Sequence, residues 1–225
     1  MATSRQGLHQ ARQSRNAGAG AAGCGRRESC SPATAAHATL VAACGDHPHP
    51  HDIILRMDLN APAADFELRD VEGRPHRLKD QRGRIVIVNF WSCECPHSER
   101  TDRALTELCS NLDGEVTLIS VASNRMEPPE TIAAVSRSRR LPVVLLDPEH
   151  AVADLYAAQT TPEVFVIDRA GVLRYRGAVD DVTFRQRNPS RSYVQEAIEA
   201  VLRDELPLMA ETPAHGCAIV REALE

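Results

Sequence analysis

The sequence predicts an α/β fold in which a mixed central sheet is flanked by helices. Residues 84–91 form a near-continuous run of Ile, Val and Phe, which is typical of a strand buried on both faces. Strand-like and helical segments alternate after this run, and two strands around Ala170-Gly171 close the pattern. The alternation indicates parallel pairing through helical crossovers, and the closing hairpin adds an antiparallel edge.

The elements can be assigned in order along the chain. Residues 66–69 and 76–78 flank a Glu-Gly turn signal and predict an N-terminal β-hairpin. The strand at 84–91 precedes a helix whose apolar residues recur every three or four positions until an Asp-Gly pair ends it. The remaining predicted elements are strands at 116–122, 143–146, 163–168 and 172–175, and helices at 128–140, 150–158 and 190–203.

Three segments are expected along the chain. They are a disordered extension at 1–56, an ordered domain at 57–206, and a C-terminal tail at 207–225 that carries Cys217. The extension is rich in Ala, Gly and Ser and lacks strand or helix periodicity. One interpretation makes Met57 the physiological start, and another keeps the extension. A third interpretation rests on LVAAC at 40–44, which resembles a bacterial lipoprotein cleavage box with Cys44 as the acylated residue.

Charge and composition exclude several function classes. Six of the 26 basic and three of the 31 acidic residues precede residue 57, so 20 basic and 28 acidic residues remain, which argues against a nucleic-acid partner. No run of about 18 apolar residues is present, so we expect no membrane-spanning helix. The seven cysteines fit neither a small disulfide framework nor a zinc-binding spacing. We therefore expect a reduced, cytoplasmic protein without a metal or another cofactor.

The segment NFWSCECPHSER at 89–100 is the main candidate for a catalytic site. Cys95 follows the apolar strand and precedes Pro96, which suits a first helical turn because its missing amide would have had no partner there. A thiol at such a corner faces the free amides and the positive dipole end of the helix, which stabilise a thiolate. A protonated His97 adds positive charge near the sulfur, whereas Glu94 opposes it. Cys95 is therefore the predicted nucleophile.

Three short motifs are spread along the chain. They are Ala-Pro-Ala-Ala-Asp-Phe-Glu-Leu at 61–68, Phe-Trp-Ser-Cys-Glu-Cys-Pro at 90–96 and Thr-Thr-Pro at 160–162. Together they resemble the thioredoxin-like redoxins of the alkyl hydroperoxide reductase and thiol-specific antioxidant superfamily, over roughly 62–204. The resemblance implies a thioredoxin-like fold in which Pro162, in cis after Thr161, faces the active cysteine and presents backbone to a disulfide substrate. The predicted substrate-binding residues are Pro96, His97, Thr161, Pro162 and Trp91, the last as a wall beside the thiol.

Turnover requires a second thiol. A Cys-x-x-Cys pair would place it at Ser98, whose hydroxyl cannot attack a mixed disulfide. Cys93 is one candidate, although two extended residues span about 6.6 Å, at the upper edge of disulfide geometry. Cys217 is another, because its Gly-Cys-Ala-Ile context resembles a recurring redoxin tail that folds back over the active site. An external thiol, from glutathione or a thioredoxin-type reductant, is the third route.

The leading hypothesis is an oxidoreductase that exchanges thiols and disulfides through Cys95. A variant begins with a peroxide, which oxidises Cys95 to a sulfenic acid before a thiol condenses with it. Val88 stands where typical peroxiredoxins place a proline, which counts against efficient peroxide reduction. The alternative is a non-catalytic binding module that uses the cis-proline surface. Loss of the second cysteine favours this alternative, whereas the retained Cys-Pro-His corner argues against it.

Overall fold

The computed structural model describes residues 57–112, 114–183 and 185–221. The strands are β1 (Glu67–Asp70), β2 (Pro75–Arg77), β3 (Ile85–Trp91), β4 (Val116–Ala122), β5 (Val144–Leu146), β6 (Thr160–Thr161), β7 (Glu163–Ile167), β8 (Leu173–Gly177) and β9 (Cys217–Ala218). The helices are α1 (Pro96–Ser110), α2 (Pro129–Ser138), α3 (Ala151–Leu155) and α4 (Tyr193–Leu202), with a short 3-10 helix η1 (Leu78–Gln81). The extension expected at 1–56 and its Cys44 lie outside the described residues.

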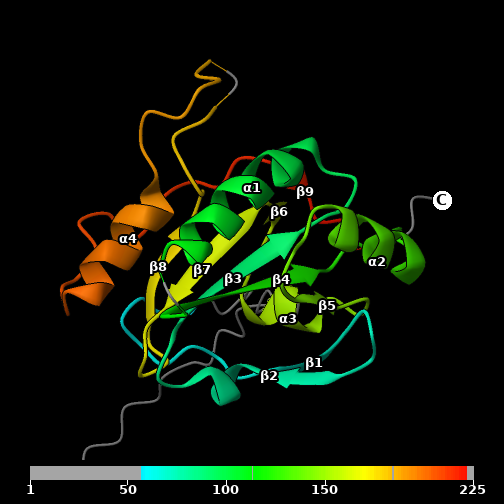
Figure 1. Cartoon of the computed structure of the whole chain (residues 1–225), viewed down its shortest axis with the longest axis horizontal. Coiled ribbons are helices and arrows are strands. Elements are labelled where there is room, and N and C mark those ends of the chain that lie inside the picture. Colours follow the sequence, from blue (N-terminus) through cyan, green and yellow to red (C-terminus); the bar gives the residue numbers. More distant parts are fainter. Residues whose placement is uncertain (1–56, 113, 184, 222–225) are drawn as a thin grey trace, which may run out of the picture. The chain divides into compact units, whose positions relative to one another are not determined.

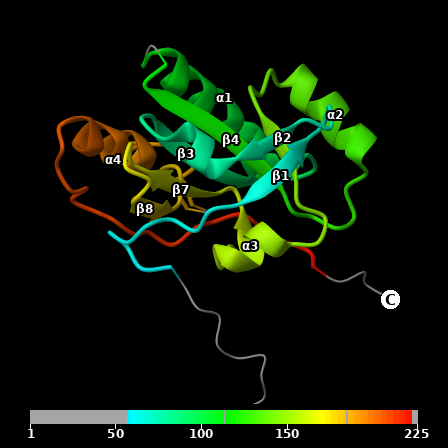
Figure 2. The ribbon, with the colours of Figure 1, turned by 90° about the horizontal axis from the view of Figure 1, so that it is seen from below.

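Seven strands form one mixed sheet in the order β2-β1-β5-β4-β3-β7-β8 (Figure 1). β3 pairs in parallel with β4 and antiparallel with β7, and β7 and β8 form the closing hairpin. Helices α1, α2 and α4 lie on one side of this sheet and α3 on the other (Figure 2). The predicted thioredoxin-like fold, with its mixed sheet and N-terminal hairpin of β1 and β2, is confirmed.

The central strand β3 is buried on both faces, as its sequence predicts. Val88 and Phe90 face a core cluster that includes Tyr156, just after α3. Ile87 faces a second cluster that includes Leu105 of α1. Each fully buried apolar side chain stabilises the fold by about 1.5–3 kcal/mol. Packing on both faces therefore holds β3 in place, and with it the position of the loop that follows.

Element boundaries differ from the predictions mainly at helix starts and at two short strands. Helix α4 begins at Tyr193 rather than 190 because the Ser192 hydroxyl accepts a hydrogen bond from the Gln195 amide and caps the helix. Strands β6 and β9 were not predicted, since two residues are too few to show alternation. They form a separate two-stranded sheet that brings the tail back to the domain.

In the part of the chain that the structure describes, no helix combines the length and apolar character needed to cross a bilayer.

Candidate active site

Cys95 lies at the corner between the buried strand β3 and helix α1. It is the N-cap residue of α1, and Pro96 occupies the first turn, as expected. The Cys95 side chain is 2% exposed. Its sulfur lies 2.8 Å from the Cys217 sulfur and 3.1 Å from the carbonyl oxygen of Thr161. A disulfide bond measures about 2.05 Å, so the two sulfurs are in contact without a bond between them.

The two thiols of this pair differ in acidity. Burial raises the pKa of Cys95, but the Cys217 thiol and the Ser98 backbone amide stabilise the thiolate, and the net pKa lies below the ordinary value. Burial, the Cys95 sulfur and the Glu127 carboxylate raise the pKa of Cys217 to about 11. The geometry therefore favours a Cys95 thiolate that accepts a hydrogen bond from a protonated Cys217.

A buried carboxylate holds the loop before Cys95. The Ser92 hydroxyl accepts a hydrogen bond from the Cys95 amide at 3.1 Å and donates to Glu127. Glu127, which is 6% exposed, also accepts from the Cys93 amide at 3.0 Å and the Asn124 side chain at 2.8 Å. These bonds fix the backbone that presents Cys95. The sequence gives no sign of this role for Glu127, because the residue lies in the loop after β4 without a local motif.

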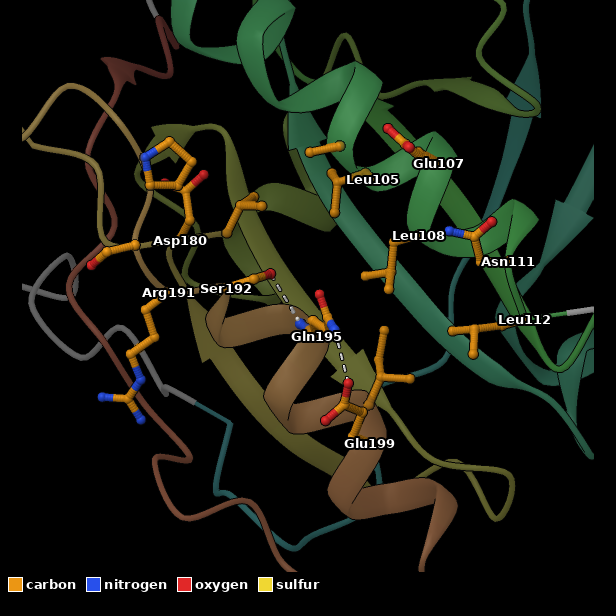
Figure 3. A pocket seen from close by; sticks show the side chains of 15 residues that line it. Leu105, Glu107, Leu108, Asn111, Leu112, Asp180, Arg191, Ser192, Gln195 and Glu199 are labelled. Carbon is orange, nitrogen blue, oxygen red and sulfur yellow. Dashed lines mark hydrogen bonds between the residues drawn. The ribbon is translucent and has the colours of Figure 1, made fainter.

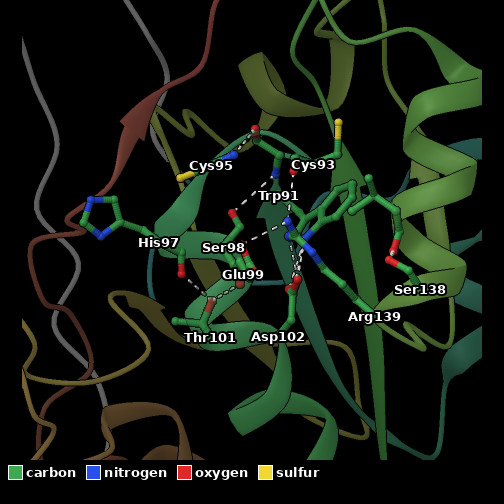
Figure 4. A network of polar contacts seen from close by, with 12 residues as sticks. Trp91, Cys93, Cys95, His97, Ser98, Glu99, Thr101, Asp102, Ser138 and Arg139 are labelled. Atoms are coloured by element: carbon green, nitrogen blue, oxygen red, sulfur yellow. Dashed lines mark hydrogen bonds and ion pairs between the residues drawn. The ribbon is translucent and has the colours of Figure 1, made fainter.

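Cys93 points away from the Cys95 sulfur. Figure 4 shows its sulfur directed away from the Cys95 sulfur. The side chain packs with Trp91 in a small apolar cluster, and the Arg139 guanidinium donates to the Cys93 carbonyl at 3.0 Å. Burial and the Glu127 carboxylate raise the pKa of Cys93 to about 12. Cys93 is therefore a packed, protonated side chain in this reduced state.

Trp91, predicted as a wall of the substrate site beside the thiol, lies inside the protein in this structure. Its ring is fully buried and packs with Ile132 of α2, because this last residue of β3 faces the α2 side of the sheet. The indole nitrogen donates to the Asp102 carboxylate at 3.0 Å, and the Arg139 guanidinium lies 5.8 Å from the ring centroid. Trp91 thus anchors the start of α1 from below the loop.

Short strand pairing fixes Cys217 over the site. Cys217 pairs with Thr161 in the antiparallel contact of β9 with β6. Gly216 lies so close to the Thr161 backbone that a Cβ atom there would stand 2.0 Å from the Thr161 oxygen. Ile219, only 5% exposed, inserts into the core, and its amide donates to the Gln159 carbonyl at 2.9 Å.

A second anchor lies before the cysteine. The Thr212 hydroxyl accepts from the Ala178 amide at 3.0 Å and contacts the Tyr175 hydroxyl at 2.6 Å. The Thr212 amide donates to the Arg176 carbonyl at 3.1 Å, and the Arg176 guanidinium pairs with Glu211 at 2.8 Å. The tail is therefore attached on both sides of Cys217.

The other predicted substrate-binding residues surround the pair. The Thr161-Pro162 peptide bond is cis, as expected, and the Thr161 carbonyl meets the Cys95 sulfur. Pro96 is exposed and His97 half-buried at the start of α1. In Figure 4, His97 and Cys93 lie on opposite sides of Cys95.

Within the described residues, neither a metal site nor the cavity between α1 and α4 includes Cys95 or Cys217. Among the residues described, no three His, Cys, Asp or Glu side chains are placed to hold a metal ion. A cavity of about 560 Å³ lies between α1 and α4 (Figure 3). Leu108 and Leu112 line this cavity from the α1 side, and Ile198 lines it from α4. Cys95 is not among its lining residues.

A family model described as the AhpC/TSA family matches residues 59–176, which include Cys95 and Pro162. The chain belongs to the AhpC/TSA family. Cys217 lies beyond the matched residues, so the family match covers the predicted nucleophile but not the thiol in contact with it.

Relatives match over about half of the chain. The thiol-disulfide oxidoreductase ResA of Geobacillus thermodenitrificans is 32% identical over 117 residues, which are 52% of this chain and 67% of that protein. The thioredoxin-like protein YneN of Bacillus subtilis is 25% identical over 114 residues, which are 50% of this chain and 66% of that protein.

Two solved structures extend the similarity over three quarters of the chain. A hypothetical protein of Sinorhizobium meliloti has a TM-score of 0.68 at 27% identity, covering 74% of this chain and 96% of its own. An uncharacterized conserved protein from Geobacillus kaustophilus has a TM-score of 0.68 at 25% identity, covering 75% of this chain and 94% of its own.

Proposed function

We propose that this chain is a thiol-disulfide oxidoreductase in which Cys95 is the nucleophile and Cys217 the resolving thiol. The observation that carries the proposal is the 2.8 Å contact between the two sulfurs. Membership of the AhpC/TSA family and similarity to a thiol-disulfide oxidoreductase support the same chemistry.

The reaction proceeds in two exchanges. The Cys95 thiolate attacks one sulfur of a substrate disulfide, forms a mixed disulfide and releases the first substrate thiolate, which takes a proton from water. Cys217 then loses its proton and attacks the Cys95 sulfur, which forms the Cys95-Cys217 disulfide and releases the second substrate thiol. The substrate gains two electrons and the protein loses two.

Access to the buried Cys95 sulfur requires a small movement of the tail. The Cys217 sulfur and the Thr161 carbonyl cover it, whereas Cys217 itself is only half-buried. In the return reaction an external thiolate attacks the more exposed Cys217 sulfur. Cys95 then departs as the better leaving group, because a thiol of lower pKa leaves faster.

Other readings of the site receive less support from its geometry. For peroxide reduction, the Ser92 hydroxyl is engaged by Glu127 and by the Cys95 amide, and Arg139 binds the Cys93 carbonyl rather than the Cys95 sulfur. A binding module without catalysis has no need of two thiols in contact. Glutathione or a thioredoxin-type reductant and a cytoplasmic location, expected from the sequence, belong to this proposal.

Disulfide mapping tests the assignment. The reduced protein, with its full chain, is treated with one equivalent of 2-hydroxyethyl disulfide, quenched by alkylation and mapped by mass spectrometry. We expect a Cys95-Cys217 bond as the main product and full alkylation of Cys93 and Cys109. A main product that links Cys95 to Cys93, or oxidation of Cys109 as fast as Cys95, would overturn the assignment.

A further inference from the structure

A cavity of about 300 Å³ is lined by residues that are close to Cys95 and Cys217 in the sequence. Three segments that are distant in sequence meet there: the start of α1, the loop after β8, and the tail just before β9. The residues that matter for its chemistry are His97, Arg100, Thr183, Arg187, His215 and Gly216. His97 follows Cys95 by two positions and Gly216 directly precedes Cys217, so the cavity is bounded by the two segments that carry the cysteines.

The cavity is rich in basic side chains. Its lining contains two arginines and two histidines but no carboxylate. Asp180 holds the Arg100 guanidinium with bonds of 2.6 and 3.1 Å, so this group is oriented but its charge is largely compensated. Arg187 is exposed and has no ion pair among the described residues, so its charge is available to a ligand. Glu99, on the first turn of α1, pairs with Arg139 at 3.6 Å instead of facing this cavity.

The tail closes the other approach to the site. An extended polypeptide can add a strand to a free sheet edge, but β9 already occupies the edge of β6 at Thr160 and Thr161. With β9 paired to β6, a substrate approaches the two cysteines through the cavity and not along a free strand edge. Its volume suits a small molecule.

We propose that this cavity binds the carboxylates of a low-molecular-weight disulfide or thiol and so selects an anionic small substrate for the Cys95-Cys217 pair. The inference rests on the proposed function and names its substrate class. An anionic disulfide RSSR enters between Arg187 and the two histidines, and the reduced pair converts it to two RSH while the Cys95-Cys217 disulfide forms. The same site holds RSH when the reaction runs in reverse.

Three small disulfides that differ only in terminal charge test the proposal: 3,3′-dithiodipropionate, which is anionic, neutral 2-hydroxyethyl disulfide, and cationic cystamine. The rate of Cys95-Cys217 disulfide formation is measured with each and divided by its rate with dithiothreitol, which removes intrinsic reactivity. We expect the anionic probe to exceed the neutral one by about tenfold, and the cationic probe to react most slowly. The preference should shrink as salt is added.

Arg187→Gln should lower the anionic-to-neutral ratio by about threefold to fivefold, as expected for one exposed charge. Arg185→Gln is the matched control, because Arg185 is exposed in the same loop but does not line the cavity. A ratio near one in the native protein, or an equal loss in the two variants, overturns the cavity assignment alone. Failure of all three probes to oxidise Cys95 overturns the proposed function itself.

Discussion

Cys93 and Cys217 were both candidate partners of Cys95, and the contrast between them shows that distance along the sequence does not predict which thiol is in contact. Cys93 is two residues from Cys95, yet its sulfur points away and its carbonyl and amide are held by Arg139 and Glu127. Cys217 lies 122 residues away and touches the Cys95 sulfur. The near cysteine packs against the sheet, whereas the distant one contacts the Cys95 sulfur.

Exchanging each cysteine for serine gives the largest expected difference between the two sides. Because an external thiol must replace a resolving group held at high effective concentration, Cys217→Ser should slow turnover of a small disulfide by at least about 100-fold and accumulate a mixed disulfide on Cys95. Cys93→Ser should retain turnover within about threefold. Steady-state rates and intact-mass spectra check both outcomes, and equal losses would contradict the contrast.

Gly216→Ala should separate the two reactive sulfurs without removing either. The new methyl group would stand 2.0 Å from the Thr161 oxygen, so the tail must shift outward. We expect the Cys95-Cys217 disulfide to form about tenfold more slowly, while iodoacetamide reaches Cys95 faster because its cover has moved. Ala218→Ser, at an exposed position of β9, is the matched control and should change neither rate.

The acidity of Cys95 should depend on the Cys217 side and not on the Cys93 side. The Cys217 thiol lowers the pKa of Cys95, so Cys217→Ala should raise that pKa and slow alkylation at pH values below it. Cys93→Ala should leave the midpoint in place. The pH dependence of Cys95 alkylation, followed by mass spectrometry, measures both. An unchanged midpoint in Cys217→Ala would show that the helix amides alone set the acidity.

The smallest expected effect concerns the anchor before Cys217. Thr212→Val removes the hydroxyl that accepts from the Ala178 amide, which leaves a buried donor unpaired and costs about 1–3 kcal/mol of unfolding free energy. Urea denaturation measures this loss. Thr117→Val, on β4, is the control because the Thr117 hydroxyl has no partner among the described residues. Equal stability of both variants would show that Thr212 does not anchor the tail.

Local sequence patterns were sufficient to predict the fold class and the position of Cys95 at the start of a helix. The apolar run at 85–91 predicts a buried strand, and the Cys-Pro pair that follows predicts the start of a helix; the structure has both. Strand pairing of the tail could not be predicted, because β6 and β9 contribute two residues each and pair across a long separation. The place of Cys217 was suggested only by resemblance to other tails. The burial of Trp91 could not be predicted, because the helix α2 that covers its ring is distant in the sequence.

The tail is attached on both sides of Cys217, so the proposed nucleophile and the proposed resolving thiol lie on separate segments of the chain. In a Cys-x-x-Cys protein, one helical turn carries both sulfurs, so any substitution there alters thiolate stability and ring closure together. Under the proposed assignment, Cys95 lies at the start of α1, whereas Gly216, Thr212 and Ile219 hold the tail that carries Cys217. We therefore expect tail substitutions away from the sulfur contact to alter ring closure first, whereas replacement of Cys217 also raises the pKa of Cys95.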